Sequence, residues 1–139
     1  MNQKVKISSG VITLTDKNYK AAGGEASIYV NGGMAYKLYH DPDKKQLPIN
    51  KMKELFGIGD PQVIVPQEII FDPSSGKPLG YTTKFVTNSD DSVEPVVKLL
   101  TRTFKDAKGI TYQMVNKFVS AIQTTTSNVH AAKCLIVDL

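Results

Sequence analysis

The chain has 139 residues, of which 41% are hydrophobic and 22% charged, so it has the length and composition of one globular domain. A single cysteine, Cys134, excludes an internal disulfide framework and a zinc site built from clustered cysteines. The net charge of +4 is spread along the chain rather than clustered, which argues against nucleic-acid binding. No apolar run is long enough to suggest a membrane span or a signal peptide, so we expect a cytoplasmic protein.

The first predicted strand covers residues 11–15, and a hairpin is predicted at 19–40, where apolar segments surround the glycine pair Gly23-Gly24. Glycines let backbone N–H groups approach a phosphate closely. Lys37, in the second strand of the hairpin, can add a positive charge to that phosphate. An ordinary hairpin with a lysine guarding its edge is the alternative that these residues leave open.

Strand alternation predicts which side chains lie beside Lys37. The residues that share a face are Ala26, Ile28 and Val30 in the first strand of the hairpin and Ala35, Lys37 and Tyr39 in the second. Small and branched apolar side chains next to a lysine would form a flat slot for a nucleotide base, with the charge beside it.

The same stretch resembles the start of the small lobe of a protein-kinase-like domain, in which a glycine-rich loop precedes a strand with a lysine. The likeness is greatest to divergent bacterial kinase-like proteins whose loop reads G-G-E-G-x-V-Y and whose lysine strand ends K-[IL]-Y. In this chain the loop runs from Gly23 to Tyr29, and the strand ends Lys37-Leu38-Tyr39. Alanines stand at positions 21 and 26, where the family has its first and third loop glycines, and alanine disfavours a close backbone grip on phosphate.

Pro48 predicts a helix over residues 47–56. This helix contains Glu54, the only glutamate between Lys37 and Glu68. The resemblance implies that Glu54 pairs with Lys37 and orients it. On the residues alone, Glu54 is equally a solvated helix glutamate.

A second hairpin is predicted from strands at 63–71 and 79–86, joined by a turn at 72–78. The kinase-like proteins carry a similar D-x-x-G-x-x-x-G-Y stretch, which is matched by Asp72, Gly76, Gly80 and Tyr81. The resemblance implies that residues 85–87 form the hinge that binds the adenine edge through its backbone. The nucleotide-binding residues implied in this way are Gly23, Gly24, Ala26, Ile28, Ala35, Lys37, Phe85 and Val86.

The polar segment 88–92 predicts a hinge or linker that divides the chain into a kinase-like small lobe, residues 1–87, and a partial large lobe, residues 93–139. Helices are predicted at 93–105 and 111–130 from the helical spacing of their apolar residues. The expected fold class is therefore α+β. It comprises a five-stranded antiparallel sheet over residues 10–87 with one packed helix, followed by two helices of an incomplete large lobe.

A buried strand pattern at 134–137 leads into Asp138 at the C-terminus. The resemblance places the family's catalytic loop here, so that Asp138 would accept the proton of the substrate hydroxyl, with Lys37 and Glu54 as the other catalytic residues. The Asn and D-F-G residues that bind Mg²⁺ in the family would lie beyond Leu139. A bound Mg²⁺ is therefore expected only in a full-length parent, and this chain is expected to have no metal site of its own.

Three functions remain open on this basis. The first is the N-terminal fragment of a kinase-like, ATP-dependent phosphotransferase that binds ATP weakly and is inactive alone. The second is a pseudokinase-type binding or scaffolding module, which the loop alanines favour, and the third is an unrelated small α+β interaction domain. In a full-length parent, the apolar stripe of helix 111–130 and the apolar run at 134–137 would pack against the rest of the large lobe. Without that lobe they would be exposed, so the isolated chain is expected to self-associate, most simply as a dimer.

Overall fold

The computed structural model describes residues 2–44, 49–86, 94–134 and 136. The chain divides into two compact units, an N-terminal unit of residues 1–85 and a C-terminal unit of residues 86–139. No helix in the described ranges combines the length and the hydropathy that crossing a membrane requires.

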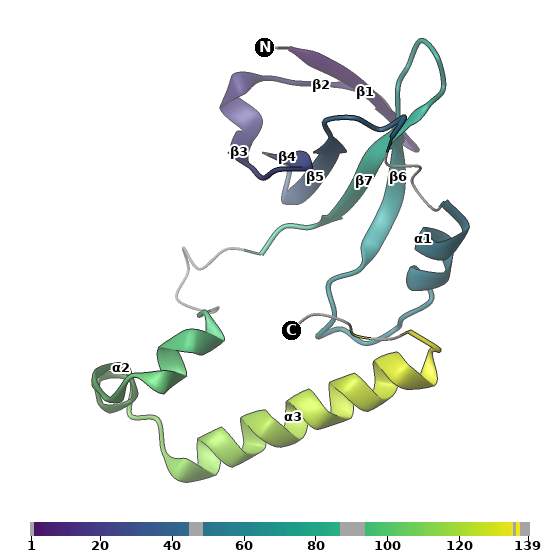
Figure 1. Cartoon of the computed structure of the whole chain (residues 1–139). Coiled ribbons are helices and arrows are strands. Elements are labelled where there is room, and N and C mark those ends of the chain that lie inside the picture. The colour runs from purple at the N-terminus through teal and green to yellow at the C-terminus, as the bar shows by residue number, and fades with distance from the viewer. Residues whose placement is uncertain (1, 45–48, 87–93, 135, 137–139) are drawn as a thin grey trace. The chain divides into compact units, whose positions relative to one another are not determined.

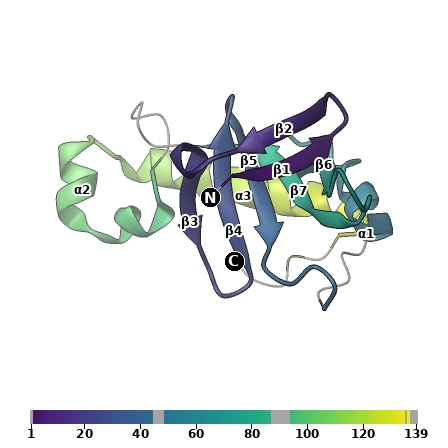
Figure 2. The same cartoon turned by 90° about the horizontal axis from the view of Figure 1, so that it is seen from above.

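The N-terminal unit is built on one antiparallel sheet, whose strands follow the order β2-β1-β6-β7-β5-β4-β3 (Figure 1). Seen from above, β3 and β4 lie on the side away from β6 (Figure 2). A short 3₁₀ helix, Asp16–Asn18, links β2 to β3. The strands are β1 Gln3–Ile7, β2 Gly10–Leu14, β3 Tyr19–Ala22, β4 Ala26–Asn31, β5 Met34–Tyr39, β6 Pro66–Phe71 and β7 Pro78–Lys84.

The prediction of a five-stranded sheet over residues 10–87 is wrong, because the described residues form seven strands and the sheet begins at Gln3. Strand β1 was missed because two lysines interrupt its short apolar pattern, although Val5 and Ile7 are buried. Strand β3 was missed because all four of its residues are exposed, so its sequence shows no alternation. The strand predicted at 63–71 is shorter than expected and starts only at Pro66.

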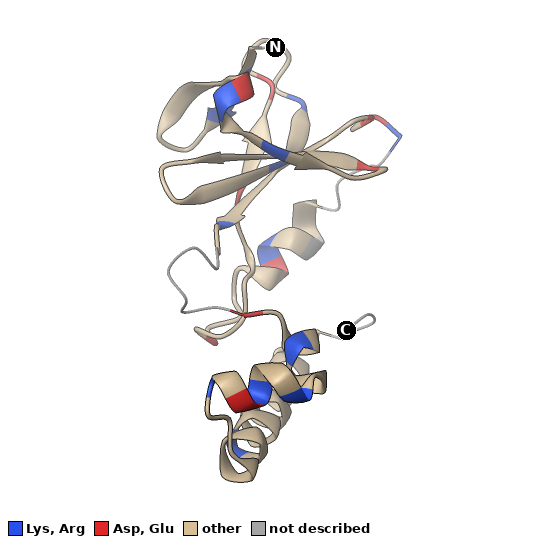
Figure 3. Ribbon diagram, turned by 90° about the vertical axis from the view of Figure 1, so that its left-hand side faces the viewer, with Lys and Arg blue, Asp and Glu red and all other residues tan. Residues whose placement is uncertain are grey.

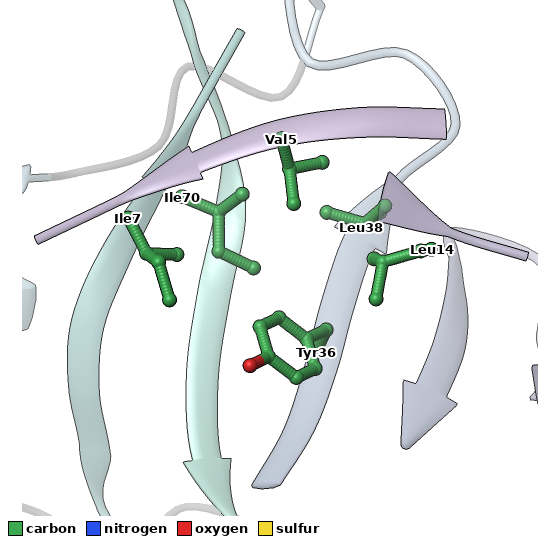
Figure 4. Packing of buried hydrophobic residues seen from close by; sticks show 6 residues of the cluster. All are labelled: Val5, Ile7, Leu14, Tyr36, Leu38 and Ile70. Carbon is green, nitrogen blue, oxygen red and sulfur yellow. The ribbon is translucent and has the colours of Figure 1, made fainter. Parts of the chain in front are cut away.

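One face of the sheet holds the main hydrophobic core (Figure 4). Val5 and Leu14 are fully buried there, as is Ile70 from β6. Figure 4 shows the side chains from β1, β2, β5 and β6 converging on the same interior. The buried members of this core are Val5, Ile7, Leu14, Tyr36, Leu38 and Ile70.

The opposite face of the sheet carries α1, Ile49–Leu55, which corresponds to the helix predicted at 47–56. Met52 of α1 is 5% exposed and forms a second buried cluster with Ile69 of β6. Tyr39 and Tyr81 pack against this cluster, so the face that carries α1 also carries these two tyrosines. Residues 47 and 48 of the predicted helix lie outside the described residues.

The C-terminal unit is helical. The helix predicted at 93–105 is instead a 3₁₀ helix, Val96–Leu100, followed by α2, Arg102–Ala107. Extended backbone at Thr101 separates these two helices, and the Thr101 hydroxyl donates to the carbonyl oxygen of Lys98. The long helix α3, Tyr112–Ala131, agrees closely with the prediction of 111–130, and the Thr111 hydroxyl caps its first turn by accepting from the N–H of Met114.

Candidate functional site

Lys37 lies near the middle of the sheet, between β4 and β7. Its register partners are Ile28 in β4 and Tyr81 in β7. Directly opposed residues of antiparallel strands share a face, so these three side chains form a row across the sheet. They lie on the face opposite the main core, because Tyr36 and Leu38, the neighbours of Lys37 in β5, are buried in that core. The predicted sharing of a face by Ala35, Lys37 and Tyr39 is confirmed by this alternation.

Two aromatic rings contact the Lys37 ammonium group. Its Nζ lies 5.3 Å from the ring centroid of Tyr39 and 5.5 Å from that of Tyr81. The two rings are neighbours, with centroids 6.4 Å apart. Distances below about 6 Å allow a cation–π attraction, so the two tyrosines hold the end of a half-buried, flexible side chain in place.

The pKa of Lys37 is raised above its ordinary value by its neighbours. Partial burial acts in the opposite direction, because it disfavours the charged form. Attraction to the ionised phenolates of Tyr81 and Tyr39, a hydrogen bond with Tyr81 and the carboxylate of Glu25 together outweigh this burial. Because the ordinary pKa of a lysine is already 10.5, Lys37 is protonated at neutral pH, and the two rings position a charge that could attract a phosphate.

Small and branched apolar residues lie beside Lys37 on the same face. Ile28 is opposite it in β4, and Ala35 precedes it by two residues in β5. Ala35 in turn pairs with Val30 of β4 and Thr83 of β7. A flat ligand could rest on these short side chains and still reach the ammonium group.

The glycine loop connects β3 to β4 and is exposed. The N–H of Gly23 donates to the carbonyl oxygen of Ala26 at 2.9 Å. Neither Gly23 nor Gly24 has a positive φ, and no described atom lies within 4 Å of a Cβ built on either residue. The fold itself therefore does not require glycine at these positions, and the loop backbone is open to a large anion. Ala26, by contrast, is 5% exposed and offers little surface to a ligand.

Glu54 and Lys37 both belong to the described residues, and no ion pair joins their side chains. Its side chain is exposed on α1. The reason is the rotation of α1, which turns Met52 toward the sheet. A residue two positions later points about 200° away around the helix axis, so Glu54 faces solvent.

The predicted hinge begins where the N-terminal unit ends. The N–H of Phe85 donates to the carbonyl oxygen of Gly33 at 3.0 Å, and the Lys20 ammonium lies 5.9 Å from the Phe85 ring centroid. Val86 is 37% exposed and belongs to the C-terminal unit.

The predicted catalytic residue Asp138 lies outside the described residues, as does Thr87 of the predicted hinge. In the strand predicted at 134–137, Cys134 and Ile136 are described and neither is in a strand.

Strand alternation places Tyr39 on the face of Lys37, but the sequence does not indicate that Tyr81 lies beside Lys37. The contact with Tyr81 depends on the pairing of β5 with β7, which no local pattern reveals. Both basic and acidic positions occur along the strands and turns of the sheet (Figure 3). Among the described residues, no group of three or more His, Cys, Asp or Glu side chains could hold a metal ion.

The chain matches no known protein-family model, and comparisons with curated proteins and with solved structures find no significant match.

Proposed function

We propose that the chain is the nucleotide-binding part of a kinase-like, ATP-dependent phosphotransferase, and that on its own it binds adenine nucleotide weakly without transferring phosphate. The observation that carries the proposal is the position of Lys37. A partly buried lysine, whose ammonium lies over two tyrosine rings, lies opposite Ile28 of β4 and two residues from Ala35, on the face opposite the main core. This combination offers an apolar surface to a base and a charge to a phosphate.

The glycine loop supports the phosphate part of this proposal. A phosphate is bound well by backbone N–H groups that no side chain covers. No side chain covers the backbone at Gly23 and Gly24, but the Gly23 N–H already donates to the Ala26 carbonyl oxygen, so the proposal relies on the Gly24 N–H. Ala21 and Ala26 stand where the resembling proteins have further glycines, so the affinity is expected to be low.

Phosphate transfer by the chain alone is not expected. Negative charge that develops on a transferred phosphoryl group is normally stabilised by a metal ion and an oriented lysine. The 139 residues contain no D-F-G motif, and Glu54 is exposed on α1 rather than paired with Lys37. Residues that bind Mg²⁺ would have to come from further sequence of a parent protein.

A non-catalytic binding module is the second candidate. It is favoured by the surroundings of Lys37, because Tyr39 and Tyr81 contact its ammonium whereas Glu54, the glutamate expected to orient it, is exposed on α1. In this case the nucleotide would stabilise the fold and would not be consumed.

The test is a titration of the ¹⁵N-labelled chain with ADP and, separately, with adenosine, followed by NMR of the backbone amides. We expect both ligands to shift amides near Ile28 and Ala35, and ADP alone to shift the amide of Gly24 as well. Shifts confined to the C-terminal unit, or none with millimolar ADP, would contradict the proposal. ATP hydrolysis by the purified chain, measured in parallel, is expected to stay at the level of the buffer.

A further inference from the structure

A cavity of about 550 Å³ lies in the N-terminal unit, and its lining does not include Lys37. It contains residues of β1, β6 and the end of α1, whereas Lys37 belongs to β5. Its volume is within the range of about 300–1,000 Å³ that small-molecule sites occupy. The residues that determine its character are Lys6, Lys53, Phe56, Glu68, Ile69 and Phe71.

The floor of this cavity is apolar. Phe71 and Ile69 belong to the cluster on which α1 packs, and Ile69 is 8% exposed. Phe56, which follows α1 directly, is 37% exposed, so its ring is available to a ligand. Lys6 is the register partner of Phe71 and therefore lies on this same face of the sheet.

The charges around the cavity favour an anion. Lys6 and Lys53 are exposed, and neither makes an ion pair with any other residue that the structure describes. The one acidic side chain in the lining, Glu68, already accepts a hydrogen bond from the N–H of Ser8 at 2.9 Å. Two lysines against one carboxylate give the lining a net positive charge.

We propose that this cavity is a second ligand site, which takes a small amphipathic anion with an aromatic body and one acidic group. The aromatic body would pack against Phe56 and Phe71, and the acidic group would lie near Lys6 and Lys53. A ring face between apolar side chains and a charge at the rim is a common arrangement for small-molecule sites. This proposal does not rest on nucleotide binding, although the two sites are neighbours: Ile69 in the cavity floor pairs with Tyr81, whose ring contacts Lys37.

The probe for the test is indole-3-acetate, with the uncharged indole-3-acetamide as its matched control. The chain contains no tryptophan, so indole fluorescence anisotropy reports the probe alone when it is excited at the long-wavelength edge. Lys6→Gln and Lys53→Gln each remove one exposed ammonium that would pair with the carboxylate of the probe. Each is expected to weaken indole-3-acetate binding about two- to five-fold. Phe56→Ala is expected to weaken binding of the acid and of the amide alike.

Lys4→Gln is the matched control variant, because Lys4 lies two residues from Lys6 in β1 but outside the cavity lining. It should leave indole-3-acetate binding unchanged. Unchanged melting temperatures would show that the exposed lysine substitutions leave the fold intact. Equal binding of acid and amide, equal loss in Lys4→Gln and Lys6→Gln, or no binding of indole-3-acetate up to millimolar concentration would each overturn the proposal.

Discussion

Gly80 of β7 lies directly against the backbone of Lys37 in β5. A Cβ built on Gly80 would overlap the carbonyl oxygen of Lys37 and crowd the Cα of Leu38. Gly80 is buried between β5 and β6, where its register partners are Leu38 and Ile70. The close approach of β7 to the lysine strand therefore depends on the missing side chain, and this approach brings Tyr81 to Lys37.

Gly80→Ala is expected to lower the free energy of unfolding by about 1–3 kcal/mol or more, because β5 and β7 must separate to admit the methyl group. Denaturant unfolding followed by circular dichroism measures this change. Gly24→Ala is the control: its methyl would meet no described atom within 4 Å, so stability should change by less than about 0.5 kcal/mol. Equal stability losses in the two variants would show that the spacing of β5 and β7 does not depend on Gly80.

Thr82→Val is expected to raise the free energy of unfolding by about 1 kcal/mol. Thr82 is 0% exposed, and its hydroxyl has no hydrogen-bond partner among the described residues. Replacing the hydroxyl with a methyl group of similar size removes the free-energy cost of burying a polar atom without a hydrogen bond. Thr83→Val, at a half-buried position on the other face, should have little effect. A clear stability loss in Thr82→Val would mean that the hydroxyl has a partner after all.

Stability is expected to fall as the pH rises above about 10. Burial and the charge of Glu68 raise the pKa of Tyr36 above 10.0, and the pKa of Lys37 is raised above 10.5. The unfolded chain therefore releases these protons at a lower pH than the folded chain, so the stability that is complete below pH 10 declines in alkaline solution.

Thermal melts between neutral pH and strongly alkaline pH measure this decline, and Tyr36→Phe isolates the contribution of the phenol. The decline should be shallower in Tyr36→Phe than in the wild type, whatever the stability of the variant at neutral pH. Identical slopes for the two proteins would exclude Tyr36 as a source of the pH dependence.

The C-terminal unit is expected to self-associate. Several apolar side chains of α3 are exposed within the unit, including Tyr112 at 80%, Val119 at 46% and Ile122 at 41%. Contiguous apolar surface of this kind tends to acquire a partner, and a two-fold pairing is the simplest closed arrangement. Sedimentation velocity over a range of concentrations should show association that Val119→Lys and Ile122→Lys reduce. Thr124→Lys, on the polar side of α3, should not reduce it, and a wild type that stays monomeric throughout would contradict this expectation.

The sequence predicted those elements whose side chains alternate between an apolar and a polar face. Strands β4 and β5 were found in this way, and so was the face on which Lys37 lies. Strand β3 could not be found, because none of its residues is buried and its place in the sheet comes only from pairing with β4.

The candidate site was predictable only where local geometry determines it. Alternation within β5 placed Ala35 beside Lys37 without reference to the rest of the fold. The contact between Lys37 and Tyr81 depends on a long-range strand pairing, and the orientation of Glu54 depends on which side of α1 Met52 anchors. Neither relationship leaves a periodic signal in the sequence, so the glutamate was expected where the structure has two tyrosines.

The most direct test of the nucleotide-binding proposal is isothermal titration calorimetry of ATP into the wild type, Lys37→Ala and Lys4→Ala. Lys4 is the control, because it is an exposed lysine of the same sheet in β1, which β6 and β7 separate from the strand of Lys37. The proposal predicts weak binding to the wild type and to Lys4→Ala, and none that can be measured to Lys37→Ala. ATP binding that is unaffected by Lys37→Ala would contradict the placement of the site, and the absence of any heat from wild-type protein would contradict nucleotide binding itself.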